Sequence, residues 1–135
     1  MRLMQLIYAS TPFGFNNPLL NNILSASRRN NARNDITGAL ICRADLFLQM
    51  LEGPRSAVTT TFKRILEDDR HLDVMLISSN DIHERMFPKW HMRDDPAQSW
   101  MWTQAQIAGD ALETASAADV RAVFERLLRE TDTHS

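Results

Sequence analysis

Two strand-like segments, residues 36–42 and 46–52, lie only three residues apart, and this short connection most constrains the fold. The first segment is rich in β-branched and apolar residues, and the second is almost wholly apolar. Residues 43–45 can join them only as an antiparallel hairpin, because a parallel pair needs a crossover of a dozen or more residues. Gly53-Pro54 then breaks the second strand. The other elements must therefore be arranged around a central hairpin.

Amphipathic helices are predicted on both sides of this hairpin. Pro18 suits a first helical turn, and apolar residues follow at helical spacing as far as the asparagine-rich stretch 29–34. A second apolar stripe begins after Pro54. Further strands are expected at residues 2–10, 73–79 and 89–94, the last with Trp90 and Met92 on one face. This order predicts an α+β, ferredoxin-like β-α-β-β-α-β fold with a fifth strand, in which two helices cover one face of a mostly antiparallel sheet.

The composition changes after Pro96, so we predict one domain over residues 1–95 and a helical extension over residues 96–135. A short helix is expected at residues 104–109. A longer helix begins at Ser116, with Asp119 in the position of a capping box. Its apolar stripe comprises Val120, Val123, Phe124, Leu127 and Leu128. Such a stripe must be covered, either by the chain's own sheet or by a partner.

Composition limits the possible partners and compartments. The chain has 135 residues, 44% of them hydrophobic, which suits one compact core. Its net charge of −2 gives no field that would attract nucleic acid or an anionic membrane. No apolar run is long enough for a membrane helix, and the single cysteine, Cys42, cannot form an internal disulfide. We therefore expect a cytoplasmic protein that binds neither nucleic acid nor membranes, and we expect a homo-oligomer, a dimer or larger.

The sequence carries no motif of a familiar enzyme or metal site. The four histidines have no metal-ligand spacing with Cys42, and GxSxG, P-loop and GxGxxG motifs are missing. The adjacent carboxylates at 68–69 and 94–95 make poor catalytic dyads, because neighbours on a helix point about 100° apart. We therefore expect neither an enzyme nor a metalloprotein.

Three polar residues interrupt otherwise apolar surfaces. Tyr8 and Gln49 lie in the middle of strands, and Asn31 ends the helical stripe that contains Ile23. Gln49 shares a face with Phe47 by strand parity. A core hydrogen bond without any ligand would explain one such residue, because a buried amide must be satisfied. Three of them on facing elements favour an apolar slot between the two helices, lined by Ile23, Ile65 and Phe47, with a few directed polar groups.

This slot suits a planar heteroaromatic ring such as an isoalloxazine. Its faces need aliphatic walls, which Ile23 and Ile65 supply. Its edge needs donors and acceptors, which suits the Asn31 amide, and a ring carbonyl suits Arg64. Arg29 or its neighbour Arg28 could meet the phosphates of a cofactor or remain solvated.

Five segments carry a more specific signal. They are 6–10 (LIYAS), 30–31 (NN) with 35–40 (DITGAL), 47–53 (FLQMLEG), 69–71 (DRH) and 85–92 (RMFPKWHM). In this order and spacing they resemble the motifs of the BLUF domain, a blue-light sensor that holds a flavin without a covalent bond. The resemblance covers about residues 2–94.

The resemblance implies FAD between the two helices, with FMN and riboflavin as the other candidates. It implies that Tyr8 and Gln49 form a hydrogen-bond relay to the flavin, with Asn31 on the pyrimidine edge. Arg64 would reach the far carbonyl and be oriented by Asp68.

It also implies a photocycle. Blue light would rearrange the Gln49 amide through electron and proton transfer from Tyr8, giving a slightly red-shifted state that decays in the dark. Trp90 and Met92 would belong to the output strand, either of them near Gln49. The output would be a changed surface near the fifth strand and the C-terminal helix, read by a partner or through a change of oligomeric state.

Two positions depart from the family pattern, and two other functions stay open. Asp35 replaces a common glycine, which aspartate can do because it tolerates left-handed backbone. Cys42 replaces a common aromatic residue and is expected to fill core volume. The alternatives are a light-independent ferredoxin-like module that binds a ligand or RNA, and a flavin redox enzyme.

Overall fold

The computed structural model describes residues 3–12, 14, 16–96, 101–109 and 111–134. A five-stranded sheet in the order β4-β1-β3-β2-β5 forms its centre. The strands are β1 (Leu3–Pro12), β2 (Thr37–Arg43), β3 (Leu46–Pro54), β4 (His71–Ile82) and β5 (Arg93–Pro96). The helices are α1 (Asn17–Asn34), α2 (Arg55–Leu66), α3 (Gln104–Ala108), α4 (Ala111–Thr114) and α5 (Ala117–His134).

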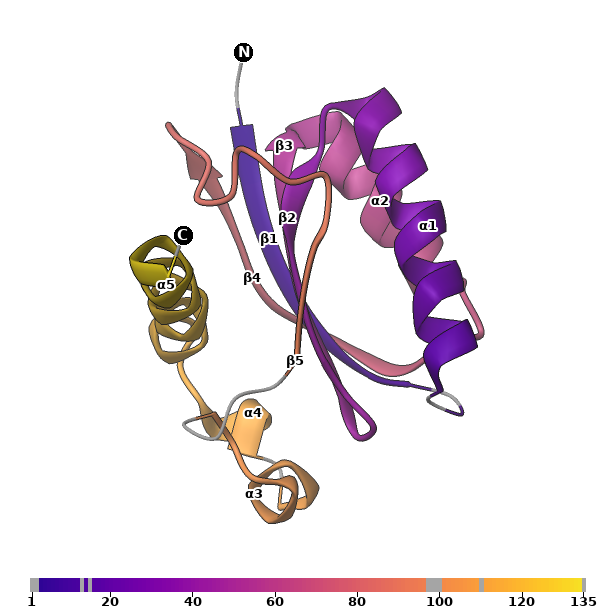
Figure 1. The fold of residues 1–135 in the computed structure, drawn as a ribbon, viewed down its shortest axis with the longest axis vertical. Coiled ribbons are helices and arrows are strands. Elements are labelled where there is room, and N and C mark those ends of the chain that lie inside the picture. Colours follow the sequence, from indigo (N-terminus) through magenta and orange to yellow (C-terminus); the bar gives the residue numbers. More distant parts are fainter. Residues whose placement is uncertain (1–2, 13, 15, 97–100, 110, 135) are drawn as a thin grey trace.

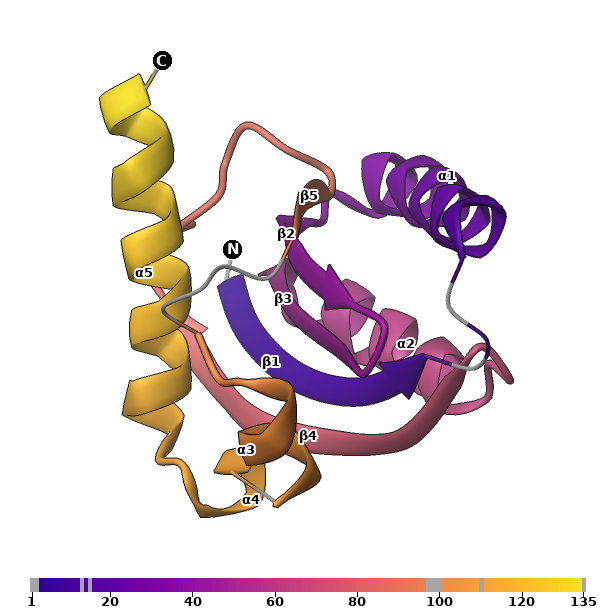
Figure 2. The ribbon, with the colours of Figure 1, turned by 60° about the horizontal axis from the view of Figure 1, so that its bottom comes forward.

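The sheet has the predicted ferredoxin-like topology. Strands β4, β1, β3 and β2 pair antiparallel, and β5 adds to β2 in parallel. The hairpin closes at the Arg43–Leu46 pair. Helices α1 and α2 lie on one face and α5 lies on the other (Figures 1 and 2). The predicted α+β class, with two helices on one face and further helices at the C-terminus, is confirmed.

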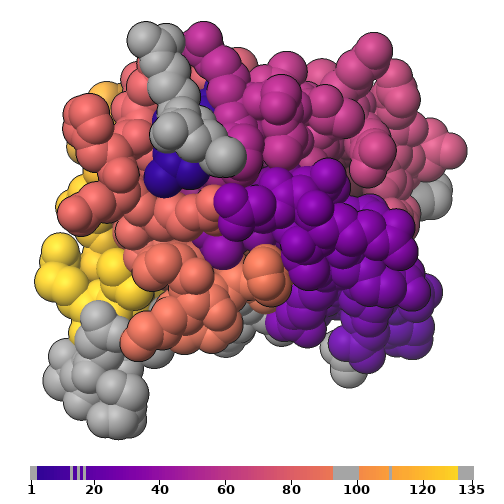
Figure 3. Space-filling model, turned by 90° about the horizontal axis from the view of Figure 1, so that it is seen from above, coloured from indigo at the N-terminus to yellow at the C-terminus, as the bar shows by residue number. Residues whose placement is uncertain are grey.

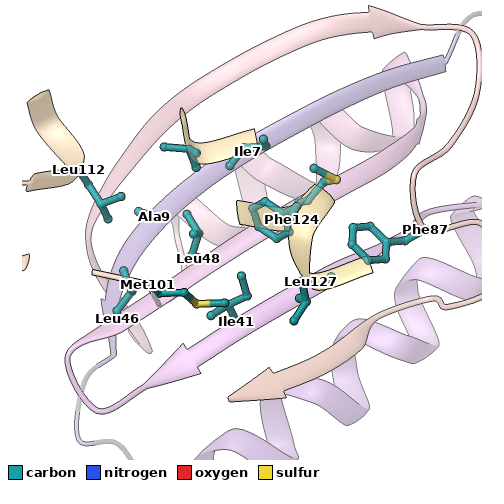
Figure 4. Packing of buried hydrophobic residues seen from close by; sticks show 13 residues of the cluster. Ile7, Ala9, Ile41, Leu46, Leu48, Phe87, Met101, Leu112, Phe124 and Leu127 are labelled. Atoms are coloured by element: carbon teal, nitrogen blue, oxygen red, sulfur yellow. The ribbon is translucent and has the colours of Figure 1, made fainter. Parts of the chain in front are cut away.

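Alternating strand residues build a separate core on each face. The core beneath α1 and α2 includes Leu6, Tyr8, Phe47, Leu51 and Met92. The core beneath α5 includes Ile7, Leu48, Phe124 and Leu127 (Figure 4). Consecutive side chains of a strand point to opposite faces. The middle strands β1 and β3 therefore bury side chains on both faces of the sheet.

Helix α5 belongs to this second core. The Ser116 hydroxyl accepts from the Asp119 amide at 3.0 Å, which confirms the predicted cap. Val120, Phe124 and Leu127 of the predicted stripe are buried against the sheet. None of the helices in the described ranges is both long and apolar enough to cross a bilayer.

The stretch before β5 differs from the prediction. The fifth strand begins at Arg93 rather than at residue 89, so Trp90 and Met92 precede it. They also lie on opposite sides of the sheet, with Trp90 against the α5 core and Met92 inside the other core. The reason is that the chain passes the edge of β2, where the Gly38 amide donates to the Trp90 carbonyl at 3.0 Å. Strand β4 also extends beyond the predicted 73–79 at both ends.

The junction between α1 and β2 uses the backbone that the sequence indicated. Asp35 ends α1 with φ 57° and ψ 39°, and its amide donates to the Asn31 carbonyl. This left-handed conformation is the one that glycine commonly supplies at a helix end. The expectation that aspartate would tolerate it is confirmed. Cys42 is buried in the core beneath α1 and α2, as expected.

Candidate functional site

A cleft of about 90 Å³ opens between α1 and α2 above strand β3. Six of the predicted site residues line it: Ile23, Asn31, Gln49, Arg64, Ile65 and Asp68. Ile23 and Ile65 stand on the two helices, while Gln49 rises from the sheet. The structure therefore brings together the aliphatic walls and the directed amides that the sequence indicated.

Tyr8 and Gln49 are direct neighbours across the β1–β3 pair, and their side chains bond. The Tyr8 hydroxyl donates to Gln49 Oε1, and Gln49 Nε2 donates to the sulfur of Met92 at 3.1 Å. Burial raises the pKa of Tyr8 far above its usual value, and the negative charge of Asp68 adds to the effect. The phenol therefore keeps its proton, and the Gln49 amide is held at both ends.

Asn31 joins the cleft to the chain before β5. It is only 1% exposed, lines the cleft, and donates from Nδ2 to the His91 carbonyl at 2.6 Å. A carboxamide offers two N–H groups and one carbonyl oxygen. The bond to His91 therefore leaves an N–H and an oxygen that can meet the polar edge of a ring.

Asp68 does not orient Arg64, which corrects the prediction. Its carboxylate accepts from Arg70 Nη2 at 2.6 Å and from the Arg70 amide at 2.9 Å. The side-chain hydrogen bond from Arg70 is the main cause that lowers the pKa of Asp68. The i,i+4 pairing with Arg64 fails because α2 ends at Leu66, so the two residues do not share a helix.

Arg64 lies where two hollows meet. It lines the cleft and also a hollow of about 240 Å³ between α2 and the C-terminal end of α1, and Thr61 belongs to both. Ligand sites occupy about 300–1,000 Å³, and the two hollows together reach the lower end of that range. The arginine is exposed, so its guanidinium can turn toward a ligand in either hollow.

His71 has a larger role in the site than the sequence suggested. It begins β4 and lines the cleft. Its Nδ1 lies 2.8 Å from Ser10 Oγ, and its ring centroid lies 5.2 Å from that of Phe47. Burial lowers the pKa of His71, against the opposing charge of Asp68, so the ring is neutral near pH 7.

Five predicted residues lie outside the cleft lining: Tyr8, Arg29, Phe47, Trp90 and Met92. Phe47 is fully buried beneath it, and Arg29 is exposed on α1. Its neighbour Arg28 donates from Nε to the Met92 carbonyl at 3.1 Å. Trp90 packs toward Phe87 on the far side, with ring centroids 6.5 Å apart. Of the two output residues, Met92 is therefore the one that contacts Gln49 in this structure.

Sequence reasoning missed several residues that line the cleft. They are Ala26, Ser27, Asn30, Leu51, Thr61, Arg70 and His71. Helical spacing gave a signal for Ser27, which lies between Ile23 and Asn31 on one face of α1. The 69–71 motif gave a signal for Arg70 and His71, but the sequence alone did not assign either residue to the cleft.

The sequence profile of the BLUF family, described as sensors of blue light using FAD, matches residues 3–93. The chain belongs to the BLUF family. Members of this family are flavin-based photoreceptors for blue light, and the domain itself is a sensor.

Several known proteins resemble this BLUF chain. Photoactivated adenylate cyclase subunit beta of Euglena gracilis is 41% identical over 69 residues, covering 51% of this chain and 8% of that protein. The blue light- and temperature-regulated antirepressor BluF of Escherichia coli (strain K12) is 30% identical over 86 residues, covering 57% and 21%. This chain thus spans a small part of both relatives.

A solved BLUF structure matches this chain along nearly its whole length. The dark-state structure of the BLUF protein BlrB superposes with a TM-score of 0.76 at 29% identity. The superposition covers 96% of this chain and 97% of that one. The likeness therefore includes the C-terminal helices as well as the BLUF core.

The residues of the cleft fit a flavin. Its walls are aliphatic, its floor carries an amide bonded to a neutral phenol, and one end carries the exposed cation of Arg64. These groups match the apolar faces, polar edge and carbonyl oxygens of a flavin ring.

Proposed function

We propose that the chain binds FAD without a covalent bond between α1 and α2 and that light switches the Tyr8–Gln49–Met92 chain of hydrogen bonds. When bound, the flavin supplies blue-light absorption and one-electron chemistry. The observation that carries the proposal is the Gln49 side chain, which lines the cleft and is bonded on both sides.

The other cleft residues bind and orient the ring. Ile23 and Ile65 cover its faces, Asn31 binds the pyrimidine edge, and Arg64 binds the far carbonyl. The hollow beside Arg64 and Thr61 accommodates part of the longer FAD tail. FAD rather than FMN or riboflavin is favoured because this second hollow adjoins the ring site at Thr61 and Arg64.

We assign the Gln49 orientation in the structure to the dark state, and this assignment explains how a rotation of the amide would change contacts elsewhere. The amide oxygen faces the Tyr8 hydroxyl, and the amide nitrogen faces the Met92 sulfur. If the amide rotates, its oxygen faces the sulfur, and neither atom can donate to the other. The contact between β3 and Met92 therefore depends on the state of the amide.

The output passes through the chain before β5 to α5 and is read by a partner protein or a second copy. Figure 3 shows this salmon-coloured chain at the surface against the purple α1 region. Leu72 and Leu76 of edge strand β4 are 41% and 50% exposed, which supports self-association as one output.

The cofactor is tested by releasing it from purified protein and identifying it by chromatography. We expect FAD. Release of FMN or riboflavin would contradict the choice of flavin. A protein that stays colourless after reconstitution with FAD would contradict the proposal and favour a light-independent binding module.

The output route is tested by hydrogen exchange in darkness and under blue light. We expect faster exchange in residues 85–92 and in α5 under light, because the Gln49–Met92 bond is lost. Identical exchange across residues 85–130 in both states would contradict this route.

A further inference from the structure

Residues 85–92 link the two faces of the sheet. Phe87 is buried on the α5 side, where its ring lies 6.3 Å from that of Phe124 in a T-shaped contact (Figure 4). Five residues later, Met92 is buried on the α1 and α2 side, against Gln49. Contacts that fix the position of this segment therefore also fix the Met92 sulfur, which Gln49 contacts.

The segment is tied at several points along its length. Near its middle and end, the Trp90, His91 and Met92 carbonyls accept from Gly38, Asn31 and Arg28. At its start, Arg85 donates to the Asp35 carbonyl at 2.8 Å and to Thr37 Oγ1 at 2.9 Å.

Glu52 binds the backbone of Met86 and Phe87. Its side chain is fully buried on the α5 side of β3. Oε2 accepts from the Met86 amide at 2.8 Å and from Gln5 Nε2 at 3.0 Å, and Oε1 accepts from the Phe87 amide at 2.8 Å. A buried carboxylate is tolerated when N–H donors satisfy it, and bonds to an ionised acceptor are stronger than neutral ones.

We propose that Glu52 is a positioning residue of the photosensor: its carboxylate holds the backbone of Met86 and Phe87 and thereby sets the contact of Met92 with Gln49. This role rests on the function proposed above. Glu52 stands three residues from Gln49 on the same strand but on the opposite face. It therefore acts on Gln49 only through the 85–92 segment, and it joins β3 to α5 through Phe87 and Phe124.

The carboxylate is suited to this role because it only accepts hydrogen bonds. Two oxygens face three N–H donors, so every contact needs an acceptor. Glu52→Gln keeps the size and shape of the side chain but places an NH₂ group against an N–H donor. Gln5→Met is the matched control, because it removes only the Gln5 contact and leaves both backbone contacts to Glu52.

The first readout needs neither flavin nor light. In flavin-free wild-type protein we expect the Met86 and Phe87 amides to exchange slowly although they lie in a connecting segment. In Glu52→Gln these amides should exchange at least about tenfold faster than in the wild type. In Gln5→Met they should exchange at nearly the wild-type rate. Wild-type Met86 and Phe87 amides that exchange as fast as the exposed Lys89 would overturn the proposal without any variant.

The second readout is the rate of dark recovery in the flavin-loaded protein. The Met92 sulfur accepts from Gln49 in the structure, so a less ordered Met92 stabilises this orientation of the Gln49 amide less. Dark recovery of Glu52→Gln should therefore be slower than that of the wild type, by a factor of up to about three. Recovery at or above the wild-type rate would overturn the role of Glu52 while leaving the photosensor intact. A wild-type protein without a light response would instead overturn the proposed function.

Discussion

At the scale of single residues, the proposed switch is centred on the Gln49 amide. Its oxygen bonds Tyr8 and its nitrogen bonds Met92. We expect Tyr8→Phe and Gln49→Leu to bind flavin and to lose the light-induced red shift, because the first lacks the phenolic proton and the second lacks the amide. Absorption spectra before and after illumination measure both properties. A normal photocycle in either variant would contradict the relay.

His71 gives the site a dependence on pH. Burial lowers the pKa of His71 from the ordinary 6.5. At pH values between 6.5 and the folded-state pKa, His71 is therefore protonated in the unfolded chain but not in the folded chain. The free energy of unfolding should therefore fall as pH drops below about 6.5. Urea unfolding of flavin-free protein measures it, and His71→Gln should flatten this dependence. The lowered pKa of Asp68 reduces the free energy of unfolding only at pH values below its ordinary 3.8, so it does not interfere with this measurement. An equal pH dependence in His71→Gln would contradict a buried neutral histidine.

The cleft residues show what can be predicted from residue patterns. Tyr8, Asn31 and Gln49 were identifiable because polar groups stand out on apolar faces, and strand parity placed Gln49 correctly. The partner of Asp68 was not identifiable, because it depends on α2 ending at Leu66. Local spacing alone favoured the helical i,i+4 neighbour.

At the scale of elements, the close approach of β2 and β3 depends on Gly38. A Cβ built there would lie 1.9 Å from the Met50 carbonyl oxygen, which is backbone and cannot turn aside. We expect Gly38→Ala to lower the free energy of unfolding by about 1–3 kcal/mol or more, the cost of forcing atoms into a packed core. Urea unfolding is the measurement.

Gly109 provides a control for this substitution. Its nearest contact for an added Cβ is the Ala105 carbonyl oxygen at 3.3 Å, at the end of the short helix α3. We expect Gly109→Ala to change the free energy of unfolding by less than about 1 kcal/mol. Equal effects at the two positions would mean that strand pairing does not depend on the missing Cβ.

The elements themselves followed from periodicity, except before β5. The hairpin, both cleft helices and the Ser116 cap were predictable because their signals are local. The course of residues 89–92 was not, because hydrogen bonds to Gly38, Asn31 and Arg28 determine it. Those partners lie far away in sequence, and parity counted along an assumed strand placed Trp90 and Met92 on one face.

At the scale of the whole molecule, α5 completes the core opposite the cleft. Phe124 is fully buried there and contacts Phe87. We expect Phe124→Ala to lower the free energy of unfolding by about 3–5 kcal/mol and to increase hydrogen exchange in α5. Flavin binding should persist in the folded fraction, because the cleft lies on the other face.

Arg126→Ala is the surface control on the same helix. Its side chain is 47% exposed and pairs with Glu130 at 3.2 Å. An exposed ion pair of this kind contributes about 1 kcal/mol at most. If Phe124→Ala had as small an effect as Arg126→Ala, α5 would not be part of the stable core.

The surface that covers the apolar stripe of α5 could not be predicted from the sequence. Its apolar stripe required a covering surface, and both the chain's own sheet and a partner satisfied that requirement. The structure shows the sheet, through long-range contacts with Ile7 and Leu48 that no local pattern encodes. Under the proposed function, light would change these contacts and thereby the binding of a partner.

The most direct test of the photosensor is the visible absorption spectrum of the purified protein in the dark, after blue light and during recovery. We expect a flavin spectrum that shifts slightly to the red under light and returns in the dark, because Tyr8 and Gln49 are bonded at the floor of the cleft. A flavin spectrum that bleaches or does not respond would contradict the photosensory relay and favour redox chemistry.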